Sequence, residues 1–105
     1  MIYKQQWGPA RHAANAAFIA LQAAKSGIRL TAYSEFAKSQ VDYLKGENPR
    51  NQCFVIGFAP NCPKKPHHRS SSCPYEGECT WDAYNNPGDN PWILYGALVG
   101  GNLTF

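Results

Sequence analysis

Residues 8–27 read GPARHAANAAFIALQAAKSG and define the first helix of the fold. Pro9 suits the first position of a helix, where the N–H that proline lacks would have no intrahelical partner. Gly27 favours the left-handed conformation that ends many helices. Apolar residues recur between them at helical spacing, which predicts a buried face formed by Ala14, Ala17, Phe18, Leu21 and Ala24. Because many of its residues are small, we expect this helix to be packed on more than one side.

Residues 31–46 read TAYSEFAKSQVDYLKG and predict a second helix. Thr31 is expected to cap its N-terminus, and Glu35 is expected in its first turn, where the helix dipole favours an anion. Gly46 is expected to end it. The predicted buried face consists of Tyr33, Phe36, Ala37, Gln40, Val41 and Leu44.

The composition changes after Gly46. One proline precedes it, whereas seven prolines and all four cysteines lie between residues 49 and 91. Residues 53–56 predict a short strand or a stiff buried segment, and residues 93–99 form a short apolar element whose type the pattern leaves open. The stretch between them lacks periodicity, and loops of that length are usually functional. Two helices and such a loop cannot bury this much aromatic surface alone, so we expect a slice of a larger, all-α domain.

The composition excludes several classes of partner. A net charge of +3, from 10 basic and 7 acidic residues that are not clustered, is too mild for nucleic-acid binding. With 44% hydrophobic and 16% charged residues, the 105-residue chain has the composition of a folded protein. We find no apolar run near the roughly 18 residues of a membrane span, and no signal-peptide pattern. We therefore expect no nucleic acid and no membrane as partners, and any export signal to lie outside this chain.

The strongest chemical signal is the cluster Pro66-His67-His68-Arg69 in the proline-rich part of the chain. Two adjacent imidazoles and a planar guanidinium supply hydrogen-bond donors suited to hydroxyl groups and carboxylates. The cluster therefore predicts a site for a polar ligand. The alternative interpretation of the same residues is a solvated basic loop.

Several ordered segments resemble the later part of glycoside hydrolase family 9, which comprises endo-β-1,4-glucanases, or cellulases. These segments are WGPARHAANAAF (7–18), FAKSQVDYLKGENP (36–49), FVIGF (54–58), PHHRSSSCP (66–74), NP (90–91) and LYGALVGG (94–101). Residues 73–81 are most similar to the animal and plant branch of the family. The resemblance covers nearly the whole chain, and its motifs follow the family's order at matching separations.

The resemblance implies a partial (α/α)6 barrel, of which residues 1–105 are a fragment with two barrel helices and a long active-site loop. The family hydrolyses with inversion: an aspartate activates water, and a glutamate about 6.5–9.5 Å away protonates the leaving oxygen. In the family the aspartate lies far upstream, in an Asp-Ala-Gly-Asp type motif, and the glutamate lies downstream, in an Asn-Glu-Val type motif. Neither motif occurs in this chain. We therefore expect both catalytic carboxylates to lie outside it.

Carried over residue by residue, the resemblance implies that His67 is the active-site histidine and that Arg69 holds the sugar beside it. Hydrogen bonds from these donors can strengthen as charge develops on the sugar. His68 occupies a variable position of the motif and is expected to be a substrate-binding neighbour. Trp7 matches an aromatic residue of the family's cleft and is expected to stack on a glucosyl ring. The alternative for Trp7 is a hydrophobic staple on the helix start.

Other residues have no such support or depart from the family. Trp81, Tyr84 and Trp92 are interpreted as packing residues. Cys53 stands where serine or threonine is common in the family. Ala59 stands where glycine is common, which predicts strain in that turn.

The four cysteines leave two interpretations open. Cys53, Cys62, Cys73 and Cys79 could hold zinc, but their spacings lack the paired Cys-x2–4-Cys knuckle that zinc sites usually have. A local disulfide between Cys73 and Cys79 is the other interpretation, and it suits an exported protein. Asn102 begins a glycosylation pattern, which is weak support for export.

The sequence therefore predicts a fragment of a secreted endo-β-1,4-glucanase that needs no cofactor or metal and is a monomer when complete. Its substrate would be cellulose, a β-1,4-glucan. Without the catalytic carboxylates, the isolated chain is expected to be inactive and to fold poorly. The alternatives are a non-catalytic carbohydrate-binding protein and a small binding module organised by zinc.

Overall fold

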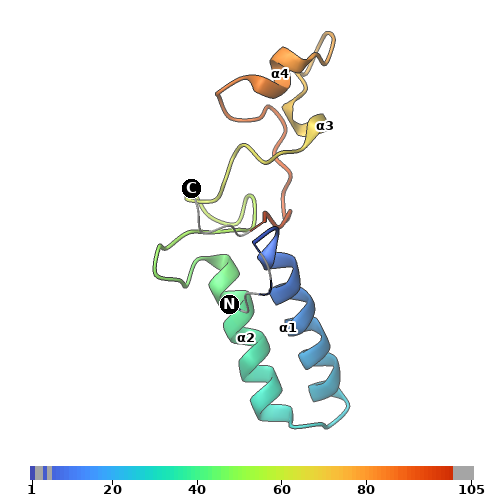
Figure 1. Cartoon of the computed structure of the whole chain (residues 1–105), viewed down its shortest axis with the longest axis vertical. Coiled ribbons are helices and arrows are strands. Elements are labelled where there is room, and N and C mark those ends of the chain that lie inside the picture. Colours follow the sequence, from blue (N-terminus) through green and yellow to red (C-terminus); the bar gives the residue numbers. More distant parts are fainter. Residues whose placement is uncertain (2–3, 5, 101–105) are drawn as a thin grey trace.

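Four helices and no strand make up the regular structure of the chain in a computed structural model that describes residues 1, 4 and 6–100. They are α1 (Pro9–Lys25), α2 (Leu30–Lys45), α3 (Arg69–Ser72) and α4 (Trp81–Asn85). Figure 1 shows α1 and α2 side by side at one end of an elongated molecule, and the two short helices at the other end. The all-α prediction is confirmed for the described residues. None of these helices is long and apolar enough to span a membrane.

Helix α1 begins and ends where the sequence predicts. Gly8 precedes it with a left-handed φ of 58°, and Pro9 is its first residue. At its other end Gly27 has a φ of 83°, and its N–H donates to the carbonyl of Ala24 at 2.9 Å. The next N–H, of Ile28, donates to a carbonyl one residue earlier in the helix, at 3.0 Å. This is the Schellman pattern, which satisfies carbonyls that the helix end leaves open.

Helix α2 ends at Gly46 as predicted, but it starts differently. It begins at Leu30, preceded by Arg29 with a left-handed φ of 43°, so Thr31 lies inside the helix and does not cap it. The carbonyl of Arg29 already accepts the Tyr33 N–H at 3.0 Å, so the N-cap is Arg29, two residues before the predicted cap. For the same reason Glu35 lies beyond the first turn.

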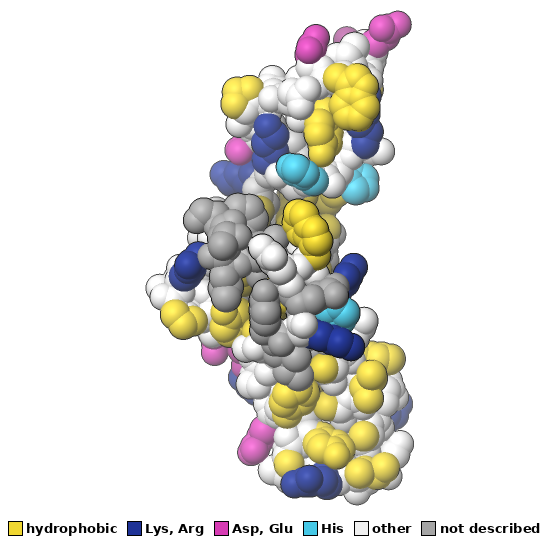
Figure 2. All heavy atoms as spheres, in the orientation of Figure 1, with side chains coloured by type: hydrophobic (Ala, Val, Ile, Leu, Met, Phe, Trp, Pro, Cys, Tyr) yellow, Lys and Arg dark blue, Asp and Glu magenta, His cyan; other side chains and the backbone are white. Residues whose placement is uncertain are grey.

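The two long helices meet through small side chains. The buried face of α1 consists of Pro9, Ala10, Ala13, Ala17, Ala20 and Ala24, and that of α2 consists of Ala37, Gln40 and Leu44. Their alanines let the helix backbones approach closely. The predictions of burial for Phe18, Leu21 and Val41 are wrong, because these side chains are 62%, 46% and 40% exposed. They lie beside the alanine row and outside the helix contact, and Figure 2 shows hydrophobic side chains gathered on this end of the molecule.

A small core anchors the rest of the chain to the helix pair. Ala10, Leu44 and Phe54 are buried together, and the ring of Tyr43 stacks on that of Phe54 with a centroid distance of 6.5 Å. Backbone hydrogen bonds join residues 54–56 to residues 96–99, including one antiparallel bridge between Val55 and Leu98. Residues 53–56 are therefore a stiff buried segment, which was one of the two predicted forms. Residues 93–99 pair with it without forming a helix or strand.

Candidate functional site

His67 lies on the surface, directly before α3. Its imidazole is exposed and meets the ring of Tyr84, from α4, edge-on at a centroid distance of 5.7 Å. Within the part of the chain that the structure describes, no side-chain hydrogen bond of His67 is found. Both ring nitrogens are therefore free to bind a ligand. Tyr84, which the sequence suggested was only a packing residue, contacts the predicted active-site histidine.

His68 is the N-cap of α3. Its Nδ1 atom accepts the N–H of Ser71 at 3.4 Å, which is a long contact. Its other role, as a substrate-binding neighbour, stays a prediction. The capping contact turns one of the two ring nitrogens toward the protein.

Arg69 spans from α3 to the start of α4. Its two terminal nitrogens donate to the carbonyls of Thr80 at 2.9 Å and Cys79 at 2.7 Å. The guanidinium also lies over the ring of Trp81, 4.6 Å from the centroid. A guanidinium has five N–H donors, so other donors remain for a ligand. Arg69 thus fixes α4, and with it Tyr84, against the segment that carries His67.

Trp7 belongs to another part of the structure, at the N-terminus of α1. Its side chain is 78% exposed. A hydrophobic staple on the helix start would be packed against the helix, so this exposure does not fit that alternative. An accessible indole is what stacking on a sugar requires. Trp92 contacts Tyr75 edge-on at 4.5 Å, but its side chain is 48% exposed, so it is only partly a packing residue.

All four cysteines form disulfides. Cys73 pairs with Cys79, the arrangement the sequence had left open, and Cys53 pairs with Cys62, which was not predicted. These bonds use the sulfur atoms that the zinc interpretation would need. The second bond also accounts for cysteine at position 53. Ala59 is not strained, because the left-handed φ in this turn belongs to Gly57, at 78°.

Two buried polar residues that sequence reasoning did not single out lie beneath the His67 loop. Ser71 is 1% exposed and Asn90 is 8% exposed. The Asn90 side-chain amide donates to the carbonyl of Pro66 at 3.0 Å and to the Ser71 hydroxyl at 2.6 Å. The sequence marks Asn90-Pro91 only as one of the segments that resemble the family, and it assigns no hydrogen bonds to Asn90.

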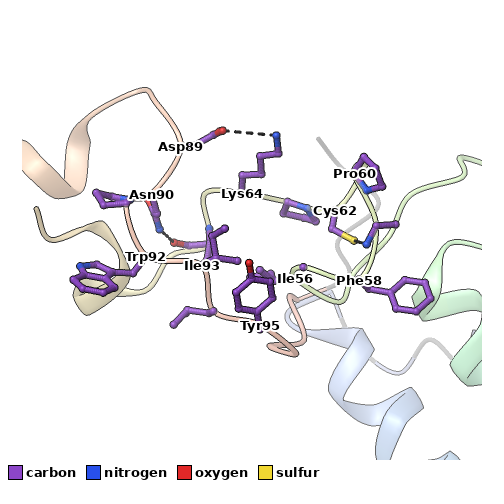
Figure 3. Close-up of a pocket in the computed structure, with 16 residues that line it drawn as sticks. Ile56, Phe58, Pro60, Cys62, Lys64, Asp89, Asn90, Trp92, Ile93 and Tyr95 are labelled. Carbon is purple, nitrogen blue, oxygen red and sulfur yellow. Dashed lines mark hydrogen bonds and ion pairs between the residues drawn. The ribbon is translucent and has the colours of Figure 1, made fainter. Parts of the chain in front are cut away.

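A cavity of about 550 Å³ lies next to this loop (Figure 3). Figure 3 shows Phe58, Trp92, Ile93 and Tyr95 around it, with the ion pair between Lys64 and Asp89 at 4.0 Å. Its lining includes Pro66 and Asn90, but none of the four residues predicted for the sugar site. His67, which follows the lining residue Pro66, therefore lies on an exposed surface beside this cavity, whereas Trp7 lies at the start of α1.

All seven acidic residues of the chain lie among the residues that the structure describes. Six of the seven are exposed: Glu35, Glu47, Glu76, Glu78, Asp82 and Asp89. The seventh, Asp42, is half-buried and pairs with Lys38 on the surface of α2.

Comparison with known proteins gives one family. The model of glycosyl hydrolase family 9 matches residues 1–103. An endoglucanase of Dictyostelium discoideum is 46% identical over 98 residues, which are 92% of this chain and 12% of that protein. The structure of an endoglucanase from the termite Nasutitermes takasagoensis is 48% identical with a TM-score of 0.86, covering 96% of this chain and 23% of that one.

A third similar protein was solved with a sugar. Endoglucanase CelQ from Clostridium thermocellum, in complex with cellotriose, is 41% identical with a TM-score of 0.75, covering 94% of this chain and 16% of that one. The chain thus spans between about an eighth and a quarter of the proteins it matches here.

Proposed function

The chain belongs to glycosyl hydrolase family 9, and on this premise we propose that it is a substrate-binding segment of an endo-β-1,4-glucanase. In this proposal His67 and Arg69 contact the glucosyl unit at the cleavage point, Trp7 stacks on a sugar ring, and the catalytic acid and base lie outside residues 1–105. The observation that carries it is the exposed imidazole of His67, which makes no side-chain hydrogen bond among the described residues. It lies on a segment that Asn90 holds through hydrogen bonds to Pro66 and Ser71.

The shape of the chain supports a segment of a larger catalytic domain, a partial (α/α)6 barrel. Its radius of gyration is 16.4 Å and its longest extent is 53 Å, whereas a compact domain of this length has a radius of about 13 Å. Large apolar side chains such as Phe18, Ile19 and Leu30 are 60–66% exposed. Apolar surface of this kind marks an interface, and here the other barrel helices would cover it.

The chemistry of inverting hydrolysis explains why this segment would bind substrate while other residues act as acid and base. Inverting hydrolysis needs a protonated acid on one side of the glycosidic bond and a base that activates water on the other. The carboxylates of this chain match neither catalytic motif of the family, whereas uncharged or cationic donors such as His67 can hold ring hydroxyls. Since those contacts tighten in the transition state, they would raise turnover. The isolated chain would not hydrolyse cellulose.

The substrate we propose is cellulose or a related β-1,4-glucan, and the complete protein would act as a secreted monomer. The CelQ complex with cellotriose supports a β-1,4-glucan. The two disulfides support export, because such bonds persist in oxidising compartments.

The test is His67→Ala in the complete enzyme, meaning the full-length protein that carries this segment, assayed on a soluble β-1,4-glucan. We expect kcat to fall at least about tenfold with KM little changed, because the lost contact strengthens in the transition state. Ser70→Ala is the matched control, because Ser70 is exposed in the same segment and has no role in the proposed sugar contact. This variant should retain kcat within about threefold. Unchanged kcat in His67→Ala would overturn the sugar contact. A complete protein that binds glucan without hydrolysing it would favour a carbohydrate-binding role.

A further inference from the structure

Asn90 links the two ends of the segment that carries the predicted sugar-binding residues. Its backbone N–H donates to the carbonyl of Lys64 at 3.1 Å. Its side-chain amide donates to the carbonyl of Pro66 at 3.0 Å and to the hydroxyl of Ser71 at 2.6 Å. Figure 3 shows Asn90 on the loop opposite Lys64, with one of these bonds dashed. One buried side chain therefore spans residues 66 to 71, with His67 between its two contacts.

Ser71 extends this restraint to His68, the residue after His67. Its hydroxyl donates to the carbonyl of His68 at 3.1 Å, while it accepts from Asn90. Its backbone N–H donates to the same carbonyl at 3.1 Å, and its own carbonyl accepts the N–H of Trp92 at 3.1 Å. The hydroxyl therefore donates one hydrogen bond, with its single O–H, and accepts another. The bonds thus form a closed network under the loop.

We infer that Asn90 is a positioning residue for His67, an inference that rests on the function proposed above. The amide fixes the carbonyl of Pro66, which is the last atom group before His67, and so sets the direction in which the imidazole leaves the loop. Asn90 itself does not contact sugar in this scheme. Its side-chain nitrogen has two hydrogens, both of which are donated within the protein, and the residue is 8% exposed.

The network requires a side chain at position 90 that donates two hydrogen bonds. Asn90→Asp is therefore the most informative change. Aspartate has the same size, so packing is kept. Its carboxylate accepts hydrogen bonds and cannot donate to the Pro66 carbonyl. The carboxylate oxygen of this variant and the carbonyl oxygen of Pro66 would therefore repel each other. Displacement of a contact group by about 1 Å can cost up to a hundredfold in rate. We expect kcat on soluble β-1,4-glucan to fall at least about tenfold, with KM little changed.

Asn86→Asp is the matched control, since Asn86 lies in the same loop. Its side-chain oxygen accepts the N–H of Gly88 at 2.8 Å and the residue is exposed. A carboxylate can accept that bond equally well. This variant should keep kcat within about twofold of the unmodified enzyme, since it makes the same chemical change without removing a hydrogen bond that the side-chain amide donates.

The decisive experiment is a double-mutant cycle in the complete enzyme with Asn90→Asp, His67→Ala and both together. If Asn90 acts through His67, the double variant should have the kcat of His67→Ala within about twofold. The inference would be overturned if the loss of kcat in the double variant equalled the product of the two single losses. It would also be overturned if the Asn90→Asp variant were as active as the unmodified enzyme.

Should Asn90→Asp not fold, Ser71→Ala replaces it in the cycle. We then expect a smaller loss of kcat and the same non-additivity. If His67→Ala alone has no effect, the proposed function fails and the inference fails with it. If His67→Ala lowers kcat but the losses multiply, only the inference fails.

Discussion

Replacement of Arg69 by lysine should loosen α4. The guanidinium makes two hydrogen bonds to adjacent carbonyls, at 2.9 and 2.7 Å, and lies 4.6 Å from the centroid of the Trp81 ring. An ammonium on a flexible chain can reach one of these carbonyls, but it cannot reproduce the planar fork or the stacking. Lysine keeps the charge, so the change isolates the geometry of the guanidinium.

The free-energy cost of Arg69→Lys follows from the contacts that are lost. One hydrogen bond from a charged donor at an exposed site contributes about 1 kcal/mol, and an exposed cation–π contact contributes about 0.5–1 kcal/mol. The sum is about 1.5–2 kcal/mol, which is a ten- to thirtyfold change in the local opening equilibrium. Because Arg69 also contacts sugar in the proposed function, kcat/KM should fall at least about tenfold.

Backbone hydrogen exchange of the amides at the C-terminal end of α4 measures this opening directly, because the first N–H groups of a helix have no intrahelical partner. In the complete enzyme, Arg69→Lys should speed exchange of these amides by ten- to thirtyfold. Arg29→Lys is the matched control, because its guanidinium lies over the Tyr33 ring at 5.7 Å, far along the chain from α4. It should leave exchange in α4 unchanged. If the exchange rates in Arg69→Lys stay within twofold of those in the unmodified enzyme, the guanidinium of Arg69 does not hold α4 in place.

Two further predictions concern the disulfides and the exposed helix face. Alkylation of the four cysteines followed by intact-mass measurement should add no label without reductant and four labels after reduction; labelling of any of them without reductant would contradict the pairing. The double change Phe18→Ser and Ile19→Ser should lower the thermal midpoint of the complete enzyme, because the proposed barrel covers these side chains, although they are 62% and 66% exposed in this chain. An unchanged midpoint by calorimetry would show that no other element packs there.

The parts of the fold that sequence predicted correctly depend on local signals. Helical spacing, Pro9, Gly27 and Gly46 set the extents of the long helices, because each acts within a few residues of itself. The start of α2 was misjudged because a left-handed Arg29 precedes it, a conformation that non-glycine residues adopt uncommonly. The exposed Phe18 was misjudged because helical spacing alone does not say which face meets the partner.

The candidate site was only partly predictable. The donors of His67 and Arg69 were recognisable from their chemistry and from the family motif. The carbonyls that hold Arg69 belong to the backbone, so no residue type marks them. Asn90 contacts Pro66 across 24 residues of sequence, and an Asn-Pro pair taken alone indicates a turn. Its buried amide becomes visible only when the two loops are seen together.

The most direct test of the central claim is a crystal structure of the complete enzyme with a cello-oligosaccharide bound. The account predicts a ring nitrogen of His67 within about 3.2 Å of a glucosyl hydroxyl, with Asn90 still bound to the carbonyl of Pro66. It also predicts that no carboxylate of residues 1–105 lies beside the scissile bond. A sugar bound in the cleft without a polar contact to His67, or with one of these carboxylates at the glycosidic oxygen, would contradict it.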